Sequence, residues 1–67
     1  SEDMAMEAYE QMKKLIAECD EDVKKAVGGN KAAGTRVRKT MQEIKEWAQK
    51  VRQDILNLRG PGEGGDE

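Results

Sequence analysis

Residues 24–31 read KKAVGGNK, and this stretch divides the chain into two helical segments. Glycine adopts the left-handed conformation that ends a helix at little cost, so Gly28 and Gly29 predict a helix end. The lysines before them suit the last turn of a helix, where they meet the negative end of its dipole. Asn30 is a good N-cap for a second helix that starts directly after it, although Thr35 could also cap a later start.

On both sides of this turn, apolar residues recur at alternating steps of three and four, which is the pattern of paired helices. In the first segment this apolar seam consists of Ala5, Tyr9, Met12, Ile16, Cys19, Val23 and Ala26. In the second segment it consists of Val37, Met41, Ile44, Ala48, Val51, Ile55 and Leu58. The sequence therefore predicts an all-α fold, an antiparallel two-helix hairpin with helices over 3–27 and 31–59 and a turn over 28–30.

The hairpin is expected to be one domain over 1–60, followed by a disordered acidic tail over 61–67. Three large apolar residues lie beside or off the seams and lack a surface to pack on: Leu15, Trp47 and Leu56. In a chain of this length, a single core rarely supplies more than ~3–5 kcal/mol. We therefore expect a homodimer, in which two hairpins form an antiparallel four-helix bundle.

The composition argues against catalysis. Histidine is absent and Cys19 is the single cysteine, so the usual acid–base catalyst, the commonest metal ligand and an internal disulfide are all missing. Cys19 falls on the apolar seam, where a small buried side chain is expected rather than a nucleophile. There is no apolar run of about 18 residues and no signal-peptide pattern. We expect a cytoplasmic protein that is not an enzyme and has no metal, cofactor, membrane or small-molecule partner.

Charge is unevenly distributed along the chain. Residues 1–27 hold eight acids and four bases, whereas residues 28–60 hold three acids and eight bases. Five of these bases recur at intervals of seven: Lys31, Arg38, Lys45, Arg52 and Arg59. They are expected along one edge of the second helix, where they could pair with acids such as Asp20 and Asp22 of a neighbouring helix. Alternatively, they could contact phosphates along a nucleic acid, and spacing alone slightly favours the pairing interpretation.

The turn offers a second candidate for phosphate contact. Residues 28–31 lead into a helix N-terminus, whose free N–H groups can bind a phosphate oxygen, and Gly34 and Thr35 keep this end open and small. The simpler interpretation is a helix stop followed by a restart. A nucleotide-binding loop is excluded, because it needs a longer glycine frame and a preceding strand.

Two stretches after the turn resemble a known family. Residues 29–39, GNKAAGTRVRK, and residues 41–52, MQEIKEWAQKVR, resemble the turn and second helix of the bacterial linker-histone-like family, best known from chlamydiae. The resemblance implies a nucleoid-associated protein that binds DNA without strong sequence preference and compacts it. Carried over to this chain, it implies phosphate contacts by Lys31, Arg36, Arg38, Lys39, Lys45 and Arg52.

The alternative comes from another functional class. A helical interaction module would bind or oligomerise through its exposed faces, without contacting nucleic acid directly. Salt distinguishes the two hypotheses, because phosphate binding weakens steeply with added salt whereas an apolar helix interface does not.

Overall fold

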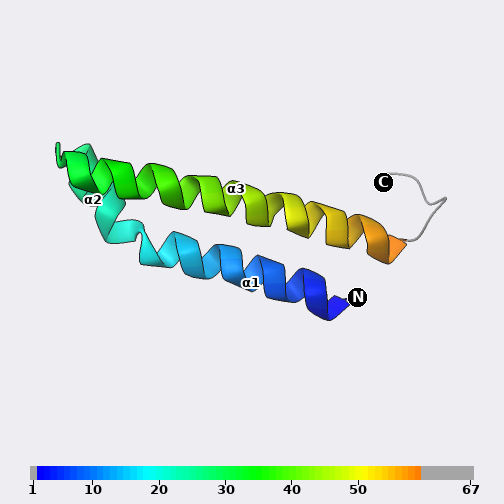
Figure 1. Cartoon of the computed structure of the whole chain (residues 1–67). Helices are drawn as coiled ribbons and strands as arrows, with labels where there is room; N and C mark the ends of the chain where they lie inside the picture. The colour runs from blue at the N-terminus through cyan, green and yellow to red at the C-terminus, as the bar shows by residue number, and fades with distance from the viewer. Residues whose placement is uncertain (1, 60–67) are drawn as a thin grey trace.

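The computed structural model describes residues 2–59, which form three helices and no strand. Helix α1 spans Glu2–Glu18, α2 spans Asp20–Val27 and α3 spans Lys31–Arg59. Both α1 and α2 lie beside α3, and together they give an elongated body of 49 × 19 × 16 Å (Figure 1). The predicted all-α class is confirmed. The acidic tail over 61–67, predicted to be disordered, lies outside the described residues.

The helix expected over 3–27 is divided at Cys19, whose φ of −93° and ψ of 3° depart from helical values. Hydrogen bonds from Cys19 N to Leu15 O (3.1 Å) and from Val23 N to Cys19 O (2.9 Å) persist, so the chain bends without unwinding. The Cys19 thiol donates to Ile16 O at 3.4 Å. Three acids in the first turn of α2 also favour a new helix N-terminus. The bend brings α2 against the first turns of α3 (Figure 1).

The turn between α2 and α3 shows why α3 begins where it does. Three backbone hydrogen bonds close it: Gly28 N to Lys24 O, Gly29 N to Ala26 O and Asn30 N to Lys25 O. Gly29 has a φ of +107°, a conformation that residues with a side chain rarely adopt. Asn30 Oδ1 accepts a hydrogen bond from Ala33 N at 2.9 Å and so caps α3. The later start at Thr35 is excluded, because the Thr35 hydroxyl donates to Lys31 O inside the helix.

The seam between the helices differs from the predicted one at every second position. On α1 and α2, the buried and half-buried seam residues are Ala5, Ala8, Met12, Leu15, Cys19, Asp22 and Ala26. On α3 they are Ala33, Val37, Thr40, Ile44, Trp47, Val51 and Asp54. The steps of three and four are kept, but the contact is rotated about each helix. Ala5, Ala8 and Ala33 are at most 5% exposed, so small side chains rather than large ones allow the helices to approach closely.

This rotation changes which large apolar residues are covered. Leu15 and Trp47, expected beside the seam, are half-buried members of it. Conversely, five residues of the predicted seam are exposed: Tyr9 (47%), Ile16 (50%), Met41 (42%), Ile55 (46%) and Leu58 (43%). We call Tyr9, Ile16, Met41 and Ile55, with the half-buried Val23 and Ala48, the apolar face. Leu56 is 51% exposed, on a different side of α3. Within the described residues, no helix has the length and apolar character that a membrane span requires.

Candidate nucleic-acid interface

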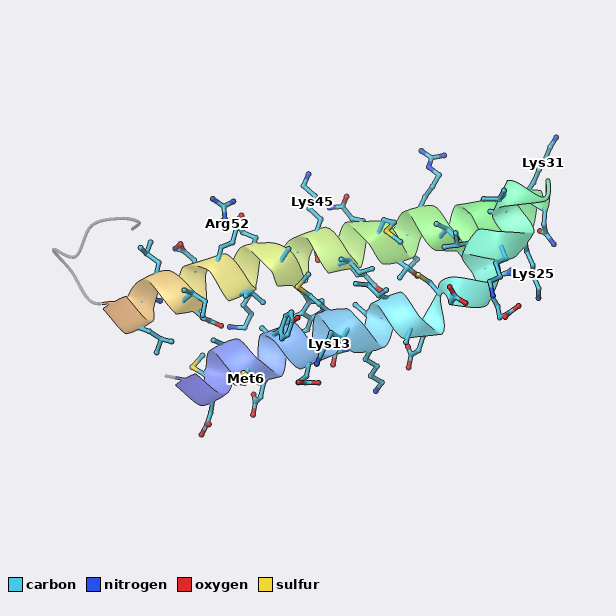
Figure 2. All side chains as sticks on the ribbon, turned by 180° about the vertical axis from the view of Figure 1, so that it is seen from behind. Met6, Lys13, Lys25, Lys31, Lys45 and Arg52 are labelled. Carbon is cyan, nitrogen blue, oxygen red and sulfur yellow. The ribbon has the colours of Figure 1, made fainter. Side chains whose placement is uncertain are left out.

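Four of the bases spaced by seven lie in a row along one side of α3, and we call Lys31, Arg38, Lys45 and Arg52 the basic row. The last three each follow a seam residue directly, so at 3.6 residues per turn the row projects roughly 130° away from the seam. All four side chains are exposed, and Figure 2 shows Lys45 and Arg52 pointing away from α1. At ~1.5 Å rise per residue, neighbours lie ~10.5 Å apart and the row is ~31 Å long.

The basic row makes no ion pair with the described residues. Asp20 pairs instead with Lys24 on its own helix, at 3.3 Å. Arg52 Nη1 donates a hydrogen bond to the side-chain amide oxygen of Gln49 at 3.4 Å, but this oxygen is neutral, so the contact is not an ion pair. Within one chain, the row is therefore not the edge of paired charges that its spacing slightly favoured. Arg59 shares the spacing, but its side chain is outside the described part of the chain.

Arg36 is placed differently from the row. Its Nε donates to Asp22 Oδ2 at 3.0 Å and its Nη2 donates to Asp22 Oδ1 at 2.9 Å, so the guanidinium grips the carboxylate with two parallel bonds. The hydrogen bond from Arg36 holds the pKa of Asp22 below its ordinary value of 3.8, and the same bond raises the pKa of Arg36. Arg36 thus fastens α2 to α3, and its charge is already matched.

Lys39 is the remaining predicted contact. It is exposed on α3 next to Arg38, and no carboxylate among the described residues pairs with it. The structure therefore brings Lys31, Arg38, Lys45 and Arg52 into one row, leaves Lys39 beside them and separates Arg36 from them.

The turn does not present an open phosphate site. The side chain of Asn30 already occupies the N–H of Ala33, one of the donors that a phosphate oxygen would need. Gly34 lies inside α3 and faces Ala26, with 4.0 Å between its Cβ position and the alanine Cβ. The stop-and-restart interpretation accounts for these contacts.

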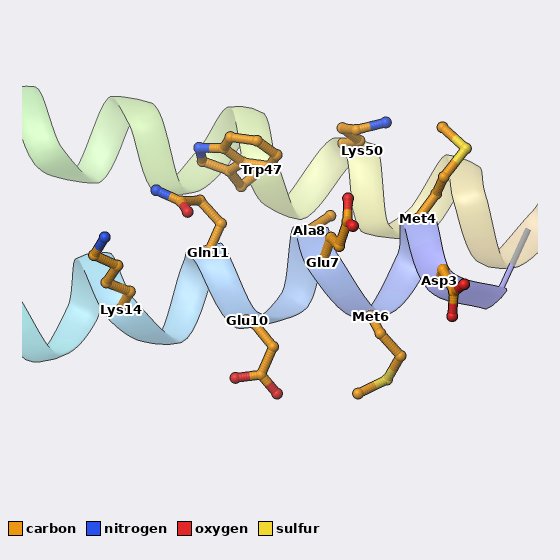
Figure 3. A pocket seen from close by; sticks show the side chains of 10 residues that line it. All are labelled: Asp3, Met4, Met6, Glu7, Ala8, Glu10, Gln11, Lys14, Trp47 and Lys50. Carbon is orange, nitrogen blue, oxygen red and sulfur yellow. The ribbon is translucent and has the colours of Figure 1, made fainter.

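Sequence reasoning missed an open groove of about 760 Å³ between α1 and α3. In Figure 3, Trp47 from α3 faces Gln11 from α1, and Lys50 lies along the same side of α3. The charge of Lys50 is directed to Asp54, whose Oδ2 lies 3.3 Å from Lys50 Nζ without hydrogen-bond geometry. With acids such as Glu7 and Glu10 also in its lining, this groove is not suited to an anion. Trp47, a large apolar residue beside the predicted seam, was the one signal for it in the sequence.

These features define a class: an elongated all-helical protein with a solvent-facing row of bases along its longest helix. The chain belongs to the family of the histone H1-like protein Hc1, whose model matches residues 6–60 and so includes the entire basic row. The resemblance to bacterial linker-histone-like proteins is thereby confirmed, and the family suggests a DNA-binding protein of the nucleoid. No curated protein and no solved structure matches the chain.

Proposed function

We propose that this protein binds duplex DNA without sequence preference, through contacts between the basic row and backbone phosphates. One observation carries the proposal: a line of four exposed bases has no carboxylate partner among the described residues, in a family of histone H1-like proteins. Lys39 adds a fifth cation beside the row. Lysine and arginine that neutralise phosphates release condensed counterions, which supplies binding that does not depend on base sequence.

The charge of the individual helices supports the same proposal, although the chain as a whole is net −2. Helix α3 carries eight bases and three acids, whereas α1 and α2 together carry four bases and eight acids. A polyanion that approaches α3 is therefore attracted by the positive electrostatic potential of this helix, even though the chain as a whole has a negative net charge. We propose that residues 1–60 act as one domain in the nucleoid of the cytoplasm, and that binding contributes to chromosome compaction.

A second candidate function is supported by the apolar face. Four large side chains that are 42–50% exposed indicate a surface that binds protein. The chain could then be an oligomerisation module without direct contact to nucleic acid. The two functions are compatible if the apolar face makes the homodimer, as in a four-helix bundle, and the basic row meets DNA.

The proposal is tested by fluorescence anisotropy with two labelled duplexes of unrelated sequence and equal length, at 50 mM salt. Binding to both with equal affinity is expected, because phosphates are common to all sequences. If no binding is seen up to high micromolar protein concentrations, the proposal is overturned, and the interaction module without nucleic-acid contact becomes the favoured function. A strong preference for one duplex would contradict the backbone mechanism, since base readout would then be required.

A further inference from the structure

The apolar face lies on one side of the molecule and contains residues of all three helices. Tyr9 and Ile16 each follow a seam residue of α1 by one position, and Met41 and Ile55 do the same on α3. In an antiparallel pair, positions that follow the seam in this way flank each other on the same side. The opposite side confirms this geometry, because Gln11 and Lys50, which each precede a seam residue, together line the groove there (Figure 3).

The apolar face is bordered by charges of different character on its two edges. On the α3 edge it is bordered by Arg38, Lys45 and Arg52 of the basic row. On the α1 edge the corresponding positions are Met6, Lys13 and Asp20, which have no net charge. A partner that covers this face must therefore tolerate a cationic edge on one side.

We infer that a second copy of this chain covers the apolar face, with α3 of each copy packed over α1 of the other. This inference rests on the proposed function for its consequence at DNA. The opposite arrangement, α3 over α3, would set two basic rows against each other, which is unfavourable for like charges. When α3 packs over the partner's α1, each basic row lies beside the α1 edge of the partner, which has no net charge. The partner's α1 and α2 are also rich in acids.

This arrangement determines where the two basic rows lie. The two α3 helices occupy diagonal corners of the four-helix bundle, and each row lies on the outer flank of its own α3, beside the partner's α1. The rows thus face opposite flanks, separated by about two helix diameters, or ~20 Å. One duplex cannot contact both rows at once, so the dimer joins two duplexes. DNA compaction would then follow from bridging.

The arrangement is tested by disulfide cross-linking in a Cys19→Ala background, which removes the native thiol. Gln11 and Trp47 face each other, so Tyr9 and Ala48 lie at nearly the same level along the bundle (Figure 3). Single Tyr9→Cys and Ala48→Cys variants are mixed and oxidised, and the products are identified by mass. Mixed disulfides between the two variants are expected. Disulfides of Ala48→Cys with itself would overturn the arrangement, and so would the absence of any cross-link in a protein that sediments as a 7.5 kDa monomer.

Bridging is tested by immobilising one duplex on beads and measuring how much of a second, fluorescent duplex the wild-type protein retains. Retention is expected. The variant Ile16→Gln with Ile55→Gln should lose it while binding a single duplex as well as wild type, because both changes are neutral. Leu56→Gln alters an equally exposed apolar residue away from the apolar face and should retain bridging. Circular dichroism verifies that each variant is folded.

The outcomes separate this inference from the proposed function. Wild-type protein that binds single duplexes but never retains a second one overturns bridging and leaves DNA binding intact. Bridging that survives the double glutamine variant overturns the role of the apolar face. Wild-type protein that binds no DNA overturns the proposed function, whereas the cross-linking result still decides the arrangement of the dimer.

Discussion

Arg36 on α3 donates two hydrogen bonds to Asp22 on α2, and this pair fastens the short helix to the long one. Asp22 is a polar member of the seam, with a side chain that is 26% exposed. Because the guanidinium stabilises the ionised carboxylate, the pKa of Asp22 in the folded chain lies below its ordinary value near 3.8. A carboxylate with a lowered pKa stabilises the fold above its ordinary pKa, and this stabilisation is lost as pH falls through the lowered value.

The Asp22→Asn variant should therefore melt at a lower temperature than wild type at pH 6. The difference should shrink as the pH falls from the ordinary value of 3.8 through the lowered pKa of folded Asp22, where wild-type Asp22 becomes protonated and loses its ionic partner as well. Circular dichroism melts at a series of pH values measure this. Glu43→Gln serves as the control, because Glu43 is exposed and makes no ion pair with the described residues. A constant difference down to pH 2 would contradict the assigned pair.

Gly29→Ala should destabilise the chain by about 1–2 kcal/mol, since a side chain is strained at its φ of +107°. Gly28→Ala is the matched control. Gly28 has a φ of −78°, and the nearest atoms to an added Cβ lie 3.5 Å away, which is ordinary contact. Thermal melts of the two variants compare them directly. Equal stability of both variants would mean that the turn has a different conformation in solution.

Trp47→Ala tests the observed seam against the predicted one. Trp47 is half-buried between α1 and α3, so its removal should cost roughly 2–3 kcal/mol, somewhat below the value for fully buried aromatic residues. Leu56→Ala should cost little, because Leu56 is 51% exposed. Urea unfolding gives both free energies of unfolding. If Leu56 proved the more costly of the two, the placement of Trp47 between α1 and α3 would be contradicted.

Asp54→Leu should stabilise the chain, by about 1–2 kcal/mol. Asp54 is only 8% exposed, and its Oδ2 has Lys50 nearby but no hydrogen bond among the described residues. An apolar residue of similar volume at such a position often exceeds a buried ion pair in stability. The same urea experiment measures the change. A clear loss of stability would show that the Asp54–Lys50 pair is satisfied better than its geometry indicates.

The turn and helix ends were predictable because local chemistry decides them. Gly29 and Asn30 act through their own backbone and side chain, and no distant contact is needed to place them. The bend at Cys19 was not predictable from the apolar pattern, which continues through it without interruption. The bend depends on the ψ of Cys19, which departs from the helical value, and on the packing of α2 against α3.

The seam was mispredicted for a definable reason. Each helix offers two registers that share every second position, and the prediction chose the one with more large apolar residues. The structure chooses the other, because Ala8 and Ala33 allow close approach and Trp47 fills the wider space. The polar residues Asp22, Thr40 and Asp54 are accommodated there. The basic row was visible in the sequence as a spacing of seven, whereas only the fold shows that no carboxylate among the described residues pairs with it.

The central claim is tested most directly by the salt dependence of duplex binding. For wild type, log affinity should fall linearly with log salt, with a slope near −4 if four or five phosphates are neutralised at about −0.9 each. Changing Arg38, Lys45 and Arg52 to Gln should flatten the slope by about 2.7, since three contacts are lost. Changing Lys13, Lys14 and Lys24 to Gln removes the same charge from α1 and α2 and should leave the slope nearly unchanged. Equal flattening in both triple variants, or no binding of wild type at 50 mM salt, would contradict the assignment of the basic row as the DNA-binding surface.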